Sequence, residues 1–193
     1  MNFTFEKEKT ALLVMEYQTV VVGMVSPGNE AGLENMVRAL DAARYAGVKV
    51  IYVVIGFRPD YPEVSPRNRS FVALRESKLF APGNPGTEVH PAVAPRPGDL
   101  SVTKHRFSAF SGSDLDMLLR AGGYETLVLA GISTSGVVLS TLRQAADLDF
   151  RLAVLKDACM DMDPEVHGVL MDKVFPRQAE VMSTQDFVGS LGS

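Results

Sequence analysis

The sequence predicts an α/β fold, a three-layer α/β/α sandwich built on a doubly wound, mostly parallel sheet of six strands, as in Rossmann-like proteins. Three observations support this prediction. Short, charge-free runs rich in Leu, Val and Ile, bounded by glycines or polar turns, are typical of strands buried on both faces. Segments between them carry apolar residues at three- and four-residue spacing, as amphipathic helices do. The two kinds of segment alternate along the chain, which favours parallel strands joined by helices.

The predicted strands follow the apolar runs. In chain order they cover residues 10–15, 49–55, 100–103, 126–132, 151–155 and 179–183.

The predicted helices are placed by their start and stop signals. The first begins at Asn29 and ends at Gly47, a short one covers residues 71–78, and another runs from Ser113 to the Gly122-Gly123 pair. The remaining helices follow the turn at residues 133–135, the Asp-Pro-Glu sequence at residues 163–165, and a cap at Thr184. Prolines keep residues 57–69 irregular, and the proline- and glycine-rich stretch 80–98 is a long connection.

Length and composition indicate one ordinary globular domain over residues 1–193. No linker or low-complexity tract divides the 193 residues, and 46% hydrophobic with 22% charged residues is enough for a sizeable core. The net charge of −4 offers no electrostatic footprint for nucleic acid or an anionic membrane. The single cysteine, Cys159, excludes an internal disulfide and fits a reducing compartment.

The amino-terminal segment predicts a cytoplasmic protein with no membrane partner. Its first ten residues carry charges of both signs, unlike a secretory signal. The apolar run at residues 10–25 is too short to span a bilayer and contains Glu16 and Gln18.

Charged side chains follow the first and third predicted strands. Glu16 comes directly after the first strand, and Lys104 follows the third. In doubly wound sheets, ligands bind at the carboxyl ends of the strands, where the strand order reverses. If that reversal falls between the first and fourth strands, Glu16 and the 131–137 segment face each other, and Lys104 opens toward the same rim.

The joint between the fourth strand and its helix is a candidate anion or oxyanion site. A buried strand that runs into a helix presents free backbone N–H groups and the positive end of the helix dipole. The substrate-binding candidates in this joint are Ile132, Ser133, Thr134, Ser135 and Gly136. Ser133, Thr134 and Ser135 are also ordinary helix caps, and a serine nucleophile is disfavoured because neither His90 nor His167 lies in an element that clearly reaches them.

Aromatic residues near the predicted rim could line an apolar ligand pocket, with core packing as the ordinary alternative. They are Tyr17, Phe57, Tyr61, Phe107 and Phe110. Two basic residues there, His105 and Arg106, flank the site and could anchor polar groups or a neighbouring subunit, although a solvated surface role is favoured for His105.

Three stretches of the sequence together resemble the isochorismatase-like hydrolases, also called the cysteine hydrolase superfamily. They are TALLVMEYQ, the loop GFRPDYPEVSPRN, and the long segment from VTKHRFSAFSG through GISTSGVVLSTLRQAADL to DPEVH. The resemblance implies a triad of Asp after the first strand, Lys after the third, and Cys six residues after the glycine that here is Gly131. Lys104 matches, Glu16 stands at the Asp position, and Val137 stands at the cysteine position.

The departures at two triad positions change the expected chemistry. Valine has no nucleophilic atom, so no thioester can form at Val137. Cys159 lies after the fifth strand and is no substitute. The metal-binding Asp-x-His of some relatives is missing from the loop that begins at Phe57, so we expect no catalytic metal and no cofactor. The resemblance also implies a cis Ile132–Ser133 peptide bond and a homo-oligomer, a dimer or tetramer.

Two functions remain open at this point. Isochorismatases proper, which also lack the cysteine, are thought to protonate a vinyl ether from the acidic residue. By this precedent the protein is a cysteine-independent hydrolase or lyase for a small organic acid or cyclic metabolite, with Glu16 as general acid or base and Lys104 as its electrostatic partner. Lys104 would lower the pKa of Glu16 and burial would raise it. The alternative is a catalytically silent relative that binds a small ligand or protein partner, with Glu16 and Lys104 as a structural ion pair.

Overall fold

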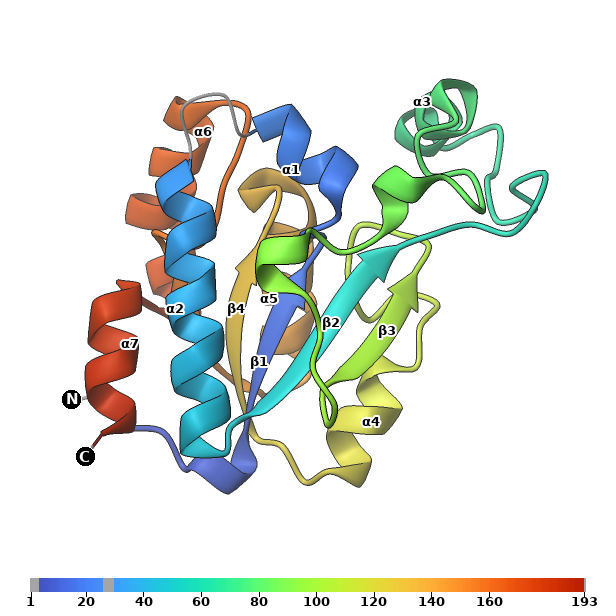
Figure 1. Cartoon of the computed structure of the whole chain (residues 1–193). Helices are drawn as coiled ribbons and strands as arrows, with labels where there is room; N and C mark the ends of the chain where they lie inside the picture. Colours follow the sequence, from blue (N-terminus) through green and yellow to red (C-terminus); the bar gives the residue numbers. More distant parts are fainter. Residues whose placement is uncertain (1–3, 26–29, 193) are drawn as a thin grey trace.

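The sheet of the computed structural model is parallel throughout, and the model describes residues 4–25 and 30–192. Within that part, six strands lie in the order β3-β2-β1-β4-β5-β6 (Figure 1). Their bounds are β1 Thr10–Met15, β2 Lys49–Ile55, β3 Leu100–Lys104, β4 Thr126–Gly131, β5 Arg151–Leu155 and β6 Glu180–Met182. Each strand predicted from the sequence is confirmed, with its ends shifted by at most one residue.

The chain builds the sheet outward from its centre in both directions. From β1 it runs through β2 to the edge strand β3, then returns to β4 and continues through β5 to β6. The reversal therefore falls between β1 and β4, as the sequence analysis assumed. The carboxyl ends of all strands meet at one edge of the sheet, where such folds bind ligands.

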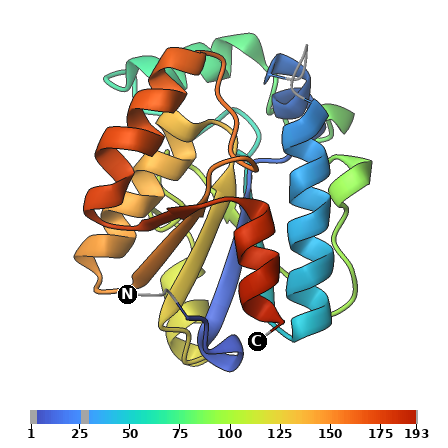
Figure 2. The same ribbon diagram turned by 90° about the vertical axis from the view of Figure 1, so that its left-hand side faces the viewer.

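Helices cover both faces of the sheet. Their bounds are α1 Thr19–Val25, α2 Glu30–Ala46, α3 Arg69–Ser77, α4 Leu115–Ala121, α5 Leu139–Asp147, α6 Pro164–Val169 and α7 Thr184–Leu191. Figures 1 and 2 show α2 and α7 side by side on one face and α5 on the other. None of the described helices is long and apolar enough to cross a membrane.

Two apolar cores lie between these layers. Alternate residues of β1 point to opposite faces, so that Leu12 and Val14 join the core under α2 and α7, while Leu13 and Met15 join the core under α4 and α5. All six residues of β1 and all six of β4 are buried, because helices cover both faces of these central strands.

One helix was not predicted from the sequence, and one helix cap was misplaced. The apolar run after β1 continues as helix α1, whose Val21, Val22 and Val25 are buried. A run that is apolar on nearly every position has no helical periodicity to recognise. The expected cap at Asn29 lies outside the described residues. Helix α7 is capped by Ser183, through a reciprocal capping box with Asp186, and the proposed cap at Thr184 was wrong.

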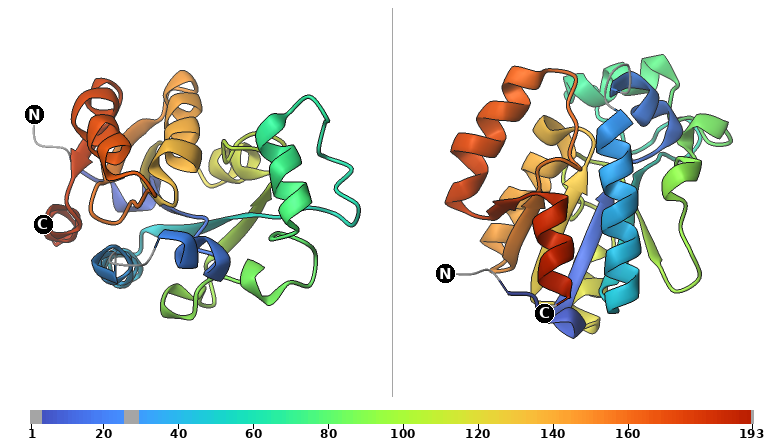
Figure 3. Two further views of the ribbon diagram at one scale, coloured as in Figure 1. Left: turned by 90° about the horizontal axis from the view of Figure 1, so that it is seen from above. Right: turned by 60° about the vertical axis from the view of Figure 1, so that its left-hand side comes forward.

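The connection between β2 and β3 first carries α3 beyond the β2 and β3 end of the sheet (Figure 3) and then runs back to contact α1 and α2. It contains α3, capped by Asn68, and two short 3-10 turns at Pro85–Thr87 and Pro91–Val93. This connection brings the loop at residues 57–68 to the same edge as the carboxyl ends of β1 and β3.

Candidate active site

Glu16 and Lys104 form an ion pair at the carboxyl edge of the sheet. Glu16 follows β1 with a positive φ of 57°, and its backbone N–H donates to the Val53 carbonyl of β2 at 2.7 Å. Lys104 is the last residue of β3, in register with Ile55 of β2. The distance from Lys104 Nζ to Glu16 Oε1 is 2.6 Å. The sequence analysis expected these side chains at one rim, and the structure brings them together across β2.

This pair is withdrawn from solvent. The side chain of Lys104 is 1% exposed and that of Glu16 is 13% exposed. Burial raises the pKa of Glu16 above its ordinary value, although the Lys104 ammonium opposes this shift. Lys104 Nζ also donates to the carbonyl of Arg106 at 2.7 Å, which fixes the ammonium in place. The sequence left the direction of the pKa shift open, and in the structure desolvation outweighs the opposite charge.

The turn after β4 begins with a cis peptide bond between Ile132 and Ser133, as the resemblance implied. Ser133 caps the following helix, because its Oγ accepts the Gly136 N–H at 3.1 Å. The first turn of this helix, Thr134–Val138, is a wide π-type turn that continues as α5.

Most N–H groups of this turn are already hydrogen-bonded within the protein, contrary to the expectation that they receive a ligand. Ile132 donates to the Met15 carbonyl at 3.1 Å, and Thr134 donates to the Met160 carbonyl at 2.9 Å. Ser135 donates to the Asp161 carboxylate at 2.7 Å. These groups complete the joint between β1, β4 and the segment after β5, so they are not free donors.

Ser133 is different from its neighbours in the turn. Its N–H donates to no acceptor within the described chain. The residue is partly exposed, and its N–H is not used by the contacts that complete the joint. Of the anion-binding groups predicted in this turn, the Ser133 N–H is therefore the best candidate.

The expectation that no histidine reaches the Ser-Thr-Ser turn was wrong. The Thr134 Oγ1 lies 2.9 Å from His167 Nδ1. Helix α6, which the Asp163-Pro164-Glu165 sequence starts as predicted, lies beside this turn and carries His167 to it. Burial lowers the pKa of His167, while Asp161 and Asp172 oppose the shift. Thr134 is fully buried, so its hydroxyl is not accessible to a substrate.

Val137 lies in the turn but its side chain packs into the protein. It is 1% exposed and belongs to the apolar core under α4 and α5, which also contains Met15 and Phe110. The side chain therefore presents almost no surface at the rim.

An aromatic cluster stands beside the ion pair. Phe57 contacts Tyr61 and Phe71, with ring centroids 5.1 and 6.0 Å apart, and Phe71 lies 5.2 Å from Phe107. Phe107 lies 3.8 Å from the position that a Cβ on Gly136 would occupy, so the cluster extends from the 57–68 loop to the turn after β4. Of these rings, Phe107 is 44% exposed and the others are buried.

Phe71 was missed as part of this cluster, because its position in a short helix gave no sign that α3 folds back onto the site. Arg106, predicted to flank the site, lies over the Phe71 ring at 5.4 Å and donates to the Glu63 carbonyl at 2.8 Å. His105 Nδ1 donates to the Gly56 carbonyl at 2.6 Å. Arg106 therefore holds the 57–68 loop against the end of β3, and His105 holds the residue that precedes this loop.

Two aromatic candidates do not join the site and instead take the core-packing alternative. Tyr17 is 1% exposed, its hydroxyl donates to the Ala158 carbonyl, and its ring lies in the core under α2. Phe110 pairs with Phe150 in the opposite core, at 6.0 Å.

No group of three or more His, Cys, Asp or Glu side chains in residues 4–25 and 30–192 is arranged to hold a metal ion. Cys159 is 4% exposed, and burial raises the pKa of its thiol to about 12. The thiol is therefore protonated at neutral pH and is a poor nucleophile.

Comparisons with known proteins agree with the fold and extend over nearly the whole chain. Solved structures with similar folds include an isochorismatase family protein from Burkholderia thailandensis, with a TM-score of 0.83 and 26% identity over 98% of each chain. A cysteine hydrolase from Pseudomonas syringae pv. phaseolicola superposes with a TM-score of 0.89 over 99% of this chain and 96% of its own. At 23% identity, that second likeness supports the fold alone.

Sequence relatives carry a more specific name. The ureidoacrylate amidohydrolase RutB of Rhizobium rhizogenes is 31% identical over 207 residues, which cover 96% of this chain and 80% of the relative. The enzyme of the same name from Acinetobacter baylyi is 32% identical over 95% of this chain and 84% of its own. The family model of the isochorismatase domain matches residues 10–186. The chain therefore belongs to the isochorismatase family of hydrolases.

Proposed function

We propose that this protein hydrolyses a small organic acid or cyclic metabolite without a cysteine nucleophile, with Glu16 as general acid and base and Lys104 as its electrostatic partner. The observation that carries the proposal is the buried 2.6 Å pair between Glu16 Oε1 and Lys104 Nζ, in which burial raises the pKa of the carboxyl. A carboxyl with a raised pKa keeps its proton closer to neutral pH and can donate it to a substrate.

The proposed reaction uses Glu16 twice. The protonated carboxyl donates its proton to the substrate atom that becomes basic as the bond breaks, and water adds to the cation-like centre. The proton released from that water returns to Glu16, so the carboxyl is regenerated. Lys104 stabilises the carboxylate between the two transfers, and the Ser133 N–H holds an anionic oxygen of the substrate.

The residue at position 137 is the reason that the proposed reaction uses no cysteine. By resemblance, Val137 occupies the place of the family's nucleophile, and valine can form no covalent intermediate. Val137 is buried, and Cys159 lies in a different segment with a raised pKa, so neither side chain supplies a nucleophile.

The proposed substrate is a small molecule with an acidic group. Hydrolases of this family act on small molecules, and the relatives named ureidoacrylate amidohydrolase take a small carboxylic acid by their name. In this proposal the rings of Phe57, Tyr61 and Phe107 form the apolar wall of the site, beside Arg106. We also propose that residues 1–193 form a single domain, which acts in the cytoplasm as a homo-oligomer.

The alternative, a silent family member that binds a ligand without turnover, is favoured by two observations. Val137 is packed into the core, and the N–H groups of residues 132, 134 and 135 are already bonded within the protein. On this alternative, Glu16 and Lys104 are only a structural ion pair.

A substrate screen with paired variants tests the proposal. The panel contains ureidoacrylate, isochorismate and related small amides and vinyl ethers, and the variants are Glu16→Gln and Glu125→Gln. Glu125 is the matched control, because it also pairs with a lysine, Lys9, but is exposed and precedes β4 at the opposite edge of the sheet. We expect turnover in the wild type, a loss of roughly 100-fold or more in Glu16→Gln, and no change in Glu125→Gln. Binding without turnover in all three proteins would instead support the silent relative.

The Val137→Cys variant tests the role assigned to position 137. If this position corresponds to the family's nucleophile, a thiol there gains amidase activity toward ureidoacrylate that the wild type lacks. Iodoacetamide labelling of the Val137→Cys protein shows whether the new thiol is reachable. A labelled but inactive variant would contradict the assignment.

A further inference from the structure

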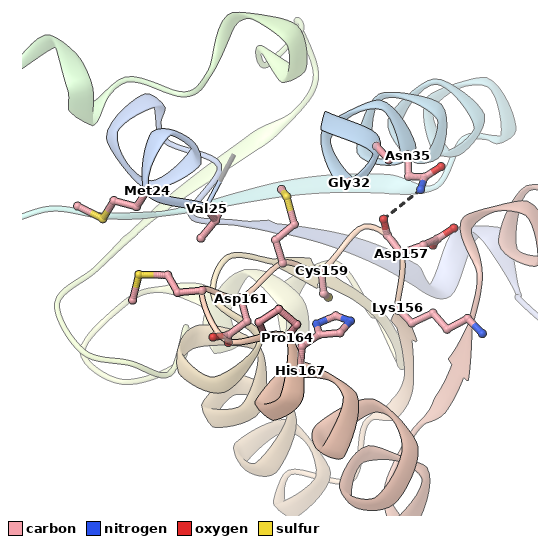
Figure 4. A pocket seen from close by; sticks show the side chains of 13 residues that line it. Met24, Val25, Gly32, Asn35, Lys156, Asp157, Cys159, Asp161, Pro164 and His167 are labelled. Atoms are coloured by element: carbon pink, nitrogen blue, oxygen red, sulfur yellow. Dashed lines mark hydrogen bonds between the residues drawn. The ribbon is translucent and has the colours of Figure 1, made fainter. Parts of the chain in front are cut away.

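A cavity lies at the carboxyl edge of the sheet, on the β5 side of the candidate active site. Its volume is about 680 Å³. Two segments line it, the end of α1 with the start of α2, and the segment after β5 that leads into α6 (Figure 4). Neither Glu16, Lys104 nor the aromatic cluster is among the lining residues, so the cavity is separate from the site described above.

Two of its lining side chains hold the turn that follows β4. Asp161 Oδ2 accepts the Ser135 N–H at 2.7 Å, and His167 Nδ1 lies 2.9 Å from Thr134 Oγ1. The Met160 carbonyl, from the same segment, accepts the Thr134 N–H. A molecule in the cavity therefore contacts the groups that fix the turn carrying the Ser133 N–H.

The charges around the cavity favour a cation. Among the described residues, the lining contains two carboxylates, Asp157 and Asp161, and one ammonium, Lys156. The Asp157 carboxylate already accepts the N–H and the hydroxyl of Thr184 at the start of α7, so Asp161 is the better partner for a bound cation. Figure 4 shows Lys156 extending away from Asp161, on the other side of His167. The amino end of α2 also faces the cavity, but its first turn carries Glu30.

Apolar side chains complete the end of the cavity where Asp161 lies. Met24 is 44% exposed and Met162 is 74% exposed, and Pro164 and Val25 also line the cavity. Exposed thioethers adapt to ligands of different shape and make favourable contacts with aromatic rings. A site with one carboxylate beside such a surface matches a small amine with an apolar body.

We infer that this cavity is a second small-molecule site, specific for an amine with an apolar or aromatic body, and that its occupancy acts on the turn after β4 through Asp161 and His167. The amine pairs with Asp161, and its apolar part packs against Met24 and Met162. Binding there changes the hydrogen bonds of Ser135 and Thr134, the neighbours of the free Ser133 N–H.

Titration of the full-length, isotope-labelled protein with phenethylamine, followed by amide NMR, tests this inference without any activity assay. Phenylpropionate, of similar size but opposite charge, is the matched ligand. We expect saturable binding of the amine at roughly millimolar concentration, shifts at the Ser135 and Thr134 amides, and binding at least tenfold weaker for the acid.

Three variants define the site. Asp161→Asn keeps an acceptor for the Ser135 N–H but loses the charge, so amine affinity falls about tenfold. Lys156→Gln removes the one lining ammonium, so affinity is unchanged or rises. Glu165→Gln, an exposed carboxylate of α6 that does not line the cavity, leaves affinity unchanged.

The inference is overturned if the amine shows no saturable binding, if the acid binds equally well, or if Asp161→Asn and Glu165→Gln behave alike. Saturable binding without shifts at residues 134 and 135 would overturn the proposed action on the turn.

Discussion

Two opposing electrostatic effects act on the pKa of Glu16. Their balance decides whether the ionised carboxylate stabilises the fold or lowers its stability. Burial disfavours its charge, whereas Lys104 at 2.6 Å favours it. The raised pKa means that the folded protein binds this proton more tightly than the unfolded chain does. An ionised Glu16 is therefore a net cost to folding, which natural proteins accept at sites selected for function.

The Glu16→Gln variant should be inactive, and the stability of the wild type relative to this variant should decrease as pH rises. Because the pKa of Glu16 is raised in the folded state, its stabilising contribution is complete below the unfolded value and is lost as pH rises through the folded value. The free energy of unfolding of the wild type, measured with urea from pH 4 upward, should therefore fall relative to that of the variant. A wild type that gains relative stability with rising pH would contradict the raised pKa.

Removing Lys104 should move the balance further toward the protonated carboxyl. In Lys104→Met the opposing charge is lost while burial remains, so the pKa of Glu16 rises again. We expect the pH at which kcat/KM declines on the alkaline side to increase, if Glu16 acts as the acid. The urea-unfolding cost of Lys104→Met should also be larger at pH 8 than at pH 5, because at pH 5 more of the buried carboxyl is neutral. A cost independent of pH would contradict this account.

Among the secondary-structure elements, the junction of β1 and β4 sets the geometry of the site. Met15 and Gly131 are paired in register, and the next residues of these strands are Glu16 and Ile132. A Cβ on Gly131 would lie 2.9 Å from Met15 Cβ and 3.0 Å from Met15 O. The absence of a side chain at Gly131 therefore allows the two strands to approach where the chain turns into the site.

The Gly131→Ala variant should separate these strands and lower the free energy of unfolding by about 1–3 kcal/mol. The control is Gly168→Ala in α6, where a Cβ meets nothing within 4 Å. That control should be neutral or stabilise by up to about 1 kcal/mol, because alanine favours a helix over glycine. Chemical denaturation of the two variants checks both values. Equal free energies of unfolding in the two variants would show that the close approach of β1 and β4 at Gly131 is not needed for stability.

For the molecule as a whole, the sequence predicted most of the architecture because burial on both faces leaves long apolar runs at every central strand. The meeting of Glu16 with Lys104 was also predictable, because the carboxyl ends of parallel strands share one edge. The contacts of Ser135 with Asp161 and of Thr134 with His167 were not. They join residues 26 and 33 positions apart through a loop whose course depends on packing. The core position of Tyr17 was equally hidden, because an aromatic residue at a strand end suits either a pocket or a core.

Exposed apolar side chains on the surface are relevant to the proposed homo-oligomer. Outside the cavity described above, helix α6 exposes two apolar side chains, Val166 at 38% and Val169 at 43%. Exposed apolar side chains of this kind are available for a contact with a second copy of the chain. We expect light scattering coupled to gel filtration to give two or four times the chain mass of 20.9 kDa. A monomer at micromolar concentration would contradict the proposed homo-oligomer.

The central claim is that burial keeps the Glu16 carboxyl protonated to a higher pH than an ordinary glutamate, beside a buried lysine. A carbon-13 NMR titration of the side-chain carboxyl in glutamate-labelled protein measures this directly, with Glu16→Gln identifying the resonance. We expect a midpoint above the ordinary value of 4.5 in the wild type, and a higher one in Lys104→Met. A midpoint at or below 4.5 would show that the ion pair dominates and would remove the basis for Glu16 as an acid.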